Sequence, residues 1–215
     1  RSLKPGILMG IFLWLGYITQ TQGLVTTSTI NSGVVTGVYV VLTPFFSKLI
    51  NKTHLSNKNY IYSFLGFLGI VLISINDITQ IFGNIFTIFC AFSYAMHIVL
   101  VERYIEDLNI SQLMFVQSFT GALLCIPFTD LNQLNNFNDY WLPILFLGLI
   151  VNVCAFYLQL YGQKVIKAST SALILSLEAI FALFIGILLA GEVLNILSWC
   201  GVLLVLISIF LVIKE

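Results

Sequence analysis

The stretch SALILSLEAIFALFIGILLA, residues 171–190, is apolar along its whole length except for small hydroxyl groups and one carboxylate, Glu178. A helix of about 20 residues crosses the hydrocarbon core of a lipid bilayer, which is about 30 Å thick. The stretch therefore predicts a transmembrane helix. Its single acid, Glu178, would lie close to the middle of the bilayer.

The composition of the whole chain agrees with a membrane protein. Of its 215 residues, 59% are hydrophobic and 8% are charged, whereas an ordinary soluble domain has about 25% charged residues. We expect an all-α, polytopic membrane helix bundle, with short links that leave no room for a soluble domain. The eight candidate spans cover residues 5–23, 30–50, 60–76, 80–103, 111–128, 141–162, 169–190 and 195–213.

The charged residues are divided between the two ends of these spans. If the spans alternate in direction, every Lys and Arg falls on one side, while Asp77, Asp130, Asp139 and Glu192 fall on the other. Cytoplasmic loops of membrane proteins carry the excess of Lys and Arg. Both ends of this chain are therefore expected in the cytoplasm. The basic set is Arg1, Lys4, Lys48, Lys52, Lys58, Arg103, Lys164, Lys167 and Lys214.

An internal repeat organises the chain. The segment GYITQTQG (16–23) resembles AFYLQLYG (155–162), and SFLGFLGIVLISI (63–75) resembles SWCGVLLVLISIF (198–210), in the same order and at nearly the same separation. The second copy begins near residue 78 and contains five spans. Because a repeat with an odd number of spans inserts upside down relative to its partner, the pattern predicts an inverted-repeat architecture.

This repeat predicts the domain organisation. Residues 1–77 would be the C-terminal three helices of a first repeat, and residues 78–215 a complete second repeat. We expect eight transmembrane helices here out of ten in two inverted five-helix repeats, with two helices before Arg1.

Two segments suggest a family. GLVTTSTINSGVVTGVYVVLTPFFSKLI (23–50) resembles the third-to-fourth helix region of EamA-type proteins of the drug/metabolite transporter superfamily. GQKVIKASTSALILSLEAIFALFIGILLAGEVLNILSWCGVLLVLISIFLVI (162–213) resembles the last two helices of the same family, including its Ser-Leu-Glu-Pro turn and Gly-Glu loop. The proline of that turn is Ala179 here. The resemblance implies ten helices in two inverted halves and export or uptake of small metabolites, often amino acids.

Glu178 is the first candidate for a transport role. An ionised carboxylate in mid-bilayer is costly, so such groups face a cavity, pair with another group or stay protonated. No Lys or Arg lies deep in any span. One hypothesis is that Glu178 lines a central pathway and binds a substrate amine or a coupling proton. The alternative is a protonated acid that hydrogen-bonds a neighbouring helix and fixes the packing.

Amide and aromatic side chains extend this pathway. Asn152, Gln159 and Gln163 share one face of the span 141–162, and such a face cannot lie against lipid. The repeat-related span offers Trp14, Tyr17, Gln20 and Thr21 on roughly one face. Two such faces would form a cavity of amides and rings, which suits zwitterions and flat organic solutes. They could equally serve as interhelical hydrogen bonds of about 0.6 kcal/mol each.

The span 30–50 combines a packing motif with a helix breaker. Pro44 frees a backbone carbonyl and can kink the span toward a cavity, so Pro44, Thr36 and Tyr39 are further pathway candidates.

Small residues predict close helix packing. Gly33 and Gly37 form a G-x-x-x-G step, which lets another helix approach closely. Ala182 and Gly186 form a similar stripe in the span 169–190, and we assign both pairs to helix packing.

Enzyme and metal chemistry lack their usual residues. The chain has no G-x-S-x-G, no H-E-x-x-H and no pair of acids within one span, so we expect no catalytic residue. The four cysteines lie singly in predicted spans without a C-x-x-C pair, so we expect no metal. His97 is interpreted as a hydrogen-bonded packing histidine. We also expect no cofactor and no nucleic-acid partner.

These observations favour a secondary transporter, an exporter of small neutral, zwitterionic or cationic metabolites such as amino acids, in the plasma membrane (the bacterial inner membrane). Phosphorylated substrates are disfavoured because they need deep cations to offset their charge. The partners would be a small-molecule substrate, the lipid bilayer and a coupling proton; the oligomeric state is left open. The alternatives are a lipid or drug exporter of the same fold, or a non-transporting membrane sensor or partner.

Overall fold

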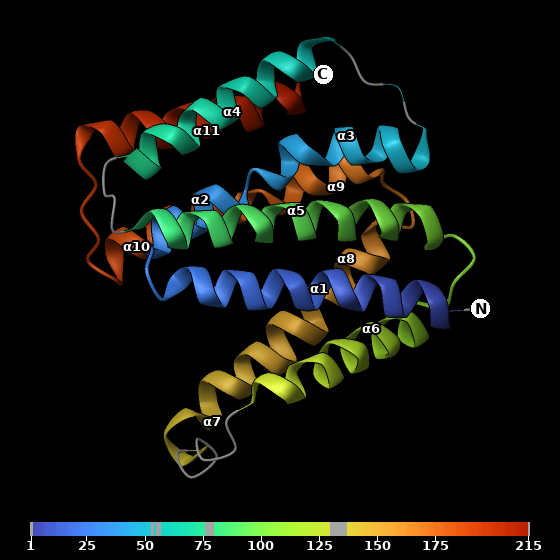
Figure 1. Cartoon of the computed structure of the whole chain (residues 1–215). Helices are drawn as coiled ribbons and strands as arrows, with labels where there is room; N and C mark the ends of the chain where they lie inside the picture. The colour runs from blue at the N-terminus through green and yellow to red at the C-terminus, as the bar shows by residue number, and fades with distance from the viewer. Residues whose placement is uncertain (1, 53, 55–56, 76–79, 130–136, 215) are drawn as a thin grey trace.

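The computed structural model describes residues 2–52, 54, 57–75, 80–129 and 137–214, and all regular structure in these ranges is helical (Figure 1). A 3-10 turn, η2 (Ile126–Phe128), extends α6, and a π-helical segment, η4 (Phe146–Ala155), joins α7 to α8. The α-helices are α1 (Leu3–Leu24), α2 (Thr29–Thr36), α3 (Tyr39–Asn51), α4 (Asn57–Ile75), α5 (Ile81–Tyr104), α6 (Ile110–Cys125), α7 (Phe137–Leu145), α8 (Phe156–Gly162), α9 (Ala168–Leu175), α10 (Leu177–Leu188) and α11 (Ile196–Ile213).

The chain is a multi-pass, all-α membrane protein, as the composition predicted. Within the described ranges, six helical segments are long and apolar enough to cross a bilayer. The other two predicted spans coincide with shorter apolar helices, Phe64–Ile73 and Ile196–Leu211, so the number eight stays a prediction. The predicted repeat boundary at residues 77 and 78 lies outside the described residues.

The helices form a central group with a pair of helices on either flank (Figure 1). In the central group, α1 and α3 pack along α5, and α2 packs along α10. On one flank α4 pairs with α11, and on the other α6 lies against α1 and contacts α8. The segments α1, α5, α8 and α10 thereby surround a common central region.

Two predicted spans are each interrupted. Residues 30–50 divide into α2 and α3 around Gly37 and Val38, and residues 169–190 divide into α9 and α10 at Ser176. At both breaks the backbone forms 3-10 hydrogen bonds, in which an N–H group donates to the carbonyl oxygen three residues earlier. Val40 N donates to Gly37 O at 3.2 Å, and Ala179 N donates to Ser176 O at 3.0 Å.

Proline does not mark either break. Pro44, which was expected to kink its span, lies buried inside the continuous helix α3. The second break forms at Ser176 although Ala179 replaces the proline of the family turn. The interruption of this span lies nearer its start, at Gly37 and Val38, and a glycine in a helix interior costs about 1 kcal/mol relative to alanine.

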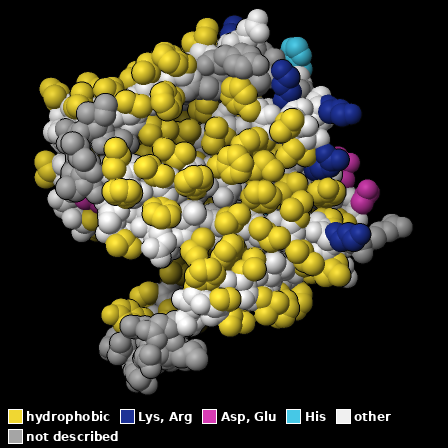
Figure 2. Space-filling view, viewed as in Figure 1, with side chains coloured by type: hydrophobic (Ala, Val, Ile, Leu, Met, Phe, Trp, Pro, Cys, Tyr) yellow, Lys and Arg dark blue, Asp and Glu magenta, His cyan; other side chains and the backbone are white. Residues whose placement is uncertain are grey.

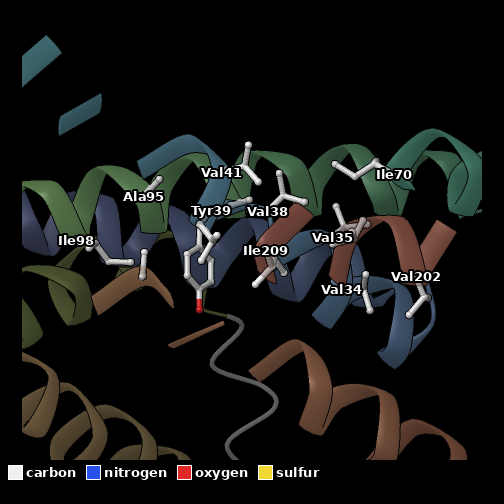
Figure 3. Packing of buried hydrophobic residues seen from close by; sticks show 14 of the residues in the cluster. Val34, Val35, Val38, Tyr39, Val41, Ile70, Ala95, Ile98, Val202 and Ile209 are labelled. Carbon is white, nitrogen blue, oxygen red and sulfur yellow. The ribbon is translucent and has the colours of Figure 1, made fainter. Parts of the chain in front are cut away.

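Apolar packing concentrates on α2 and α3. Figure 3 shows Val34, Val35, Val38 and Val41 between side chains of the neighbouring helices, and residues from α4, α5, α9 and α11 complete this cluster. Tyr39 belongs to it through its ring, while its hydroxyl points away from the apolar side chains (Figure 3). A second cluster, around Met9, Leu113 and Leu160, joins α1, α6 and α8.

Small residues bring the α2 region and α10 into close contact at three points. A Cβ atom added to Gly33 would overlap the methyl group of Ala182, and one added to Gly37 would lie 3.0 Å from the Cβ of Ala179. Gly186 faces Ile30 in the same way. The residues predicted as packing positions, Gly33, Gly37, Ala182 and Gly186, therefore lie in one contact between the 29–51 and 168–188 segments.

The α4–α11 pair shows a reciprocal contact of the same kind. A Cβ atom on Gly69 would lie 2.7 Å from the carbonyl oxygen of Gly201, and a Cβ atom on Gly201 would lie 2.7 Å from the carbonyl oxygen of Gly69. The two backbones can approach this closely only because both residues are glycine.

The surface is largely apolar, as expected for helices in contact with lipid. On the face seen in Figure 2, hydrophobic side chains cover most of the surface, and the Lys and Arg side chains lie at one end. Figure 1 shows that α5 ends and α1 begins at this end of the molecule.

The close contact between α2 and α10 predicts the effect of Gly33→Ala. The added methyl group must displace Ala182, so we expect a loss of about 1–3 kcal/mol in the free energy of unfolding. Gly121→Ala is the control, because nothing lies within 4 Å of a Cβ atom at Gly121. Thermal unfolding in detergent, followed by tryptophan fluorescence, would measure both; equal effects of the two substitutions would contradict the contact.

Candidate functional site

A cavity of about 790 Å³ lies among α1, α3, α5, η4, α8, α9 and α10. It is bounded by polar and aromatic side chains from helices far apart in the sequence. Six of the residues predicted for the pathway line it: Tyr17, Gln20, Tyr39, Asn152, Gln159 and Glu178.

The other three predicted pathway residues are not among those that line the cavity. Thr36 is buried behind it and accepts a hydrogen bond from Gln20 Nε2 at 3.4 Å. Trp14 packs against Phe128, with ring centroids 5.7 Å apart. Pro44 is enclosed within α3. Thr36 thus supports a cavity residue from behind, and Trp14 and Pro44 lie in helix contacts elsewhere.

Glu178 lies in the first turn of α10, directly after the break at Ser176, and its side chain is exposed to the cavity. A carboxylate is favoured at this end of a helix because the helix dipole places partial positive charge there. The side chain of Gln20, on α1, lies beside the Glu178 carboxyl group. Among the described residues that line the cavity, none is Lys or Arg.

Gln20 connects this acid to two further helices. Its Nε2 donates to Thr36 Oγ1 on α2, and its Oε1 accepts a hydrogen bond from the Tyr94 hydroxyl on α5 at 3.3 Å. The Gln20 amide therefore uses both its donor and its acceptor groups between α1, α2 and α5. Gln159 also lines the cavity, without a direct hydrogen bond to Glu178 among the described contacts.

The amides of η4 and α8 have partners of their own. Tyr17 OH donates to Asn152 Oδ1 at 3.3 Å, and Asn152 Nδ2 donates to Ser118 Oγ at 3.4 Å. Gln159 Nε2 donates to Gln163 Oε1 at 3.0 Å. These bonds agree with the hypothesis that the amides hydrogen-bond within the protein. Asn152 and Gln159 also line the cavity, as the pathway hypothesis expected.

Aromatic rings make up much of the remaining wall. Tyr17 meets Tyr94 and Phe156 edge to face, with centroids 6.5 and 6.0 Å apart, and Phe156 meets His97 at 5.7 Å. Such arrangements let the positive ring edge of one residue contact the negative face of the next. His97 also pairs with Gln117 Oε1 at 3.2 Å, in keeping with its interpretation as a hydrogen-bonded packing histidine.

Tyr94 was not among the predicted pathway residues. Its signal in the sequence is its spacing from His97: the two are three residues apart and so share a helix face. A face that carries both Tyr94 and His97 on an otherwise apolar span is a sequence signal for a cavity wall, as is the face of Asn152 and Gln159.

Tyr39 presents a buried phenol that the protein leaves unpaired. The residue is 2% exposed, lines the cavity, and its hydroxyl has no hydrogen-bond partner among the described residues. A buried polar group without a partner costs about 1–3 kcal/mol. The Tyr39 hydroxyl is therefore a buried, unpaired group at the cavity wall, and a bound molecule that reached it would supply its missing partner.

Comparison with known proteins gives consistent matches. The model of the EamA-like transporter family matches residues 81–214. An uncharacterized transporter of Archaeoglobus fulgidus is 32% identical over 215 residues, which cover 98% of this chain and 69% of that protein. The uncharacterized transporter YdfC of Bacillus subtilis is 27% identical over 183 residues, which cover 80% of this chain and 60% of that protein.

A solved structure supports the fold. A protein of known crystal structure matches with a TM-score of 0.63 and 15% identity, over 95% of this chain and 74% of that one. At this identity the likeness concerns the fold alone.

The position of Gln20 predicts the effect of Gln20→Leu. The substitution removes the hydrogen bonds of Gln20 with Thr36 and Tyr94 and the polar group beside Glu178, so we expect a loss of about 1–3 kcal/mol in the free energy of unfolding. Gln22→Leu is a matched control on the same helix, because Gln22 is exposed. Thermal unfolding of both variants in detergent would measure the difference, and a Gln20→Leu protein as stable as the control would contradict this role.

Proposed function

The chain belongs to the EamA-like transporter family, and from this premise we propose that it is a secondary carrier that exports small neutral, zwitterionic or cationic metabolites, such as amino acids, across the plasma membrane. The family matches point to a transporter rather than an enzyme. The observation that carries the proposal is Glu178, a single carboxylate exposed to a cavity of about 790 Å³ between the helices.

The size and chemistry of the cavity support a small organic substrate. Ligand pockets usually measure about 300–1,000 Å³ and combine apolar walls with a few polar groups. Here the polar groups are one carboxylate, three tyrosines and several amides. Amides and phenols offer both donors and acceptors, which suits a molecule that carries an amine and a second polar group.

The sign of the charge supports an amine over a phosphate. Tyr17, Tyr39 and Tyr94 lie close enough to Glu178 to interact with its charge, and a carboxylate flanked by aromatic rings attracts an ammonium group. A phosphate would meet Glu178 without a cation to offset the repulsion. A proton on Glu178 is the other way to neutralise this acid, so we also propose coupling to protons through competition for the same carboxylate.

The helix bounds support the proposed inverted repeat of residues 1–77 and 78–215. The short helices α2 and α9 each have eight residues, and they begin 139 residues apart, at Thr29 and Ala168. The helices α4 and α11 begin at Asn57 and Ile196, again 139 residues apart. Broken helices in corresponding positions of two halves mark substrate sites in many secondary carriers.

The end that carries the visible Lys and Arg side chains in Figure 2 is the proposed cytoplasmic end. Both ends of this chain would then face the cytoplasm, in a bacterial cell the inner side of the inner membrane.

A lipid or drug exporter of the same fold is the second candidate. Leu24, Leu147 and Val151 also line the cavity, and an apolar wall of this kind suits a hydrophobic solute. A non-transporting membrane sensor is the third reading, and solute flux separates it from both carriers.

We expect cells that express the complete gene to change the concentrations of a few amine-bearing metabolites in the medium, and Glu178→Gln to abolish the change, because the variant lacks the charge that binds the amine. Untargeted profiling of medium and cytosol measures both. Glu106→Gln, at an exposed acid beyond α5, is the control. Equal shifts in wild type and Glu178→Gln would make the acid structural, and no shift in either would favour the sensor.

Tyr39→Phe separates binding from packing. Because the Tyr39 hydroxyl is buried without a partner among the described residues, its removal should not lower the free energy of unfolding and should raise it by up to about 1–3 kcal/mol. If a substrate uses this hydroxyl, KM should rise about 2- to 10-fold. Tyr157→Phe, at an exposed tyrosine outside the cavity lining, is the matched control for uptake measured in proteoliposomes; an unchanged KM in both variants would count against a substrate contact.

A further inference from the structure

Glu192 binds the beginning of a helix from the other part of the chain. It lies in the connection between α10 and α11, where Gly191 adopts a φ of +66° and the Glu192 backbone N–H donates to Gly186 O at 3.0 Å. Its Oε1 accepts a hydrogen bond from Thr29 N at 2.7 Å, and its Oε2 accepts one from Ile30 N at 3.0 Å. Both carboxylate oxygens are thus used at the N-terminus of α2, where backbone N–H groups have no partner within the helix.

Glu102 makes a corresponding contact from the last turn of α5. Its Oε1 accepts a hydrogen bond from Ala168 N, the first residue of α9, at 3.0 Å. Its Oε2 accepts hydrogen bonds from Asn51 Nδ2 at 2.6 Å and Ser47 Oγ at 3.2 Å, both near the end of α3. The single carboxylate therefore ties the end of α3 to the start of α9.

The two contacts lie at opposite ends of the helix bundle. The helix α2 begins next to the end of α1, whereas Glu102 lies near the opposite end, where α1 begins and α5 ends (Figure 1). Each contact joins a helix from residues 1–77 to one from residues 78–215. The cavity lies between these two groups of helices, with residues from both in its wall.

Hydrogen bonds of this kind suit an end of the helix bundle that opens and closes during transport. They are charge-assisted and depend steeply on geometry, so they are either formed or absent. When such an end opens, water can satisfy both the carboxylate and the helix N–H groups, which is impossible for groups in the hydrocarbon region. The glycine and alanine contacts between α2 and α10 are apolar, so they do not switch between a formed and an absent hydrogen bond.

We propose, on the basis of the carrier function above, that Glu192 and Glu102 are the gate residues at the two ends of the transport cycle. Glu192 closes its end of the cavity by binding the start of α2 from the other half. Glu102 closes the opposite end by joining the start of α9, in its own half, to the end of α3 from the other half. Loss of one contact shifts the population toward the conformation open at that end, because the contact stabilises only the closed state there.

The test measures access to the cavity from each side of the membrane. The four cysteines, Cys90, Cys125, Cys154 and Cys200, are replaced by alanine, and one new cysteine is introduced by Ala155→Cys, at an exposed position in the cavity wall. Membrane vesicles of both orientations are treated with a membrane-impermeant maleimide. Glu192→Ala should raise the labelling rate about tenfold from the side on which Glu192 lies and not from the other, and Glu102→Ala should do the reverse.

Two control variants separate gating from weakened structure. Ser28→Ala removes the N-cap of α2, whose Oγ accepts from Asn31 N at 3.2 Å, but this bond is local to one helix. Glu106→Ala removes an exposed acid just beyond α5. Neither should change the side from which the cavity is labelled. If an alanine variant fails to fold by size-exclusion chromatography, Glu192→Gln and Glu102→Gln retain one carbonyl acceptor and should give smaller shifts in the same directions.

Equal increases from both sides, or no change in folded variants, would overturn the proposal. Labelling requires no substrate, so its result is independent of the proposed function. Side-specific shifts in a protein without solute flux would support the gates and count against the carrier. Solute flux without side-specific shifts would support the carrier and count against the gates.

Discussion

The free-energy cost of a carboxylate inside a bilayer is the constraint on which the centre of this protein depends. Glu178 is accommodated in three ways: it lies in the first turn of α10, it lies beside the Gln20 amide, and it is exposed to a cavity. Each requires structure elsewhere, because the helix must break at Ser176 and α1 must lie in register with α10. The broken helix, the Gln20 amide and the cavity therefore form one arrangement.

A broken helix in a membrane creates a second requirement. The new helix ends must find hydrogen-bond partners, because lipid offers none. At the outer ends of the broken helices, Glu192 meets α2 and Glu102 meets α9. In the interior, the breaks tighten to 3-10 bonds at Gly37 and Ser176. Glu102, Glu178 and Glu192 thus lie where a broken helix begins.

Much of the fold could be predicted from the sequence because hydropathy reports which segments contact lipid. The described helix ends lie close to the predicted span ends, as for α5 and the segment 80–103. The helix breaks escaped prediction because Gly37 and Ser176 hardly alter hydropathy, while Pro44, the helix breaker that the sequence offers, lies inside α3. The pairing of Glu178 with Gln20 depends on the register between α1 and α10, and periodicity within one helix contains no information about register. Tyr94 was missed because a single phenol on an apolar span resembles a core residue.

The reciprocal contact of Gly69 and Gly201 has a consequence for how this sequence can diverge. The carbonyl oxygen of each glycine occupies the space that a side chain on the other would need. A larger residue at one position cannot be compensated by a smaller one at its partner, since the partner is already the smallest. Among relatives that keep this helix crossing, the two positions should be jointly invariant. Methods that infer contacts from correlated substitutions would then overlook one of the tightest contacts in the molecule.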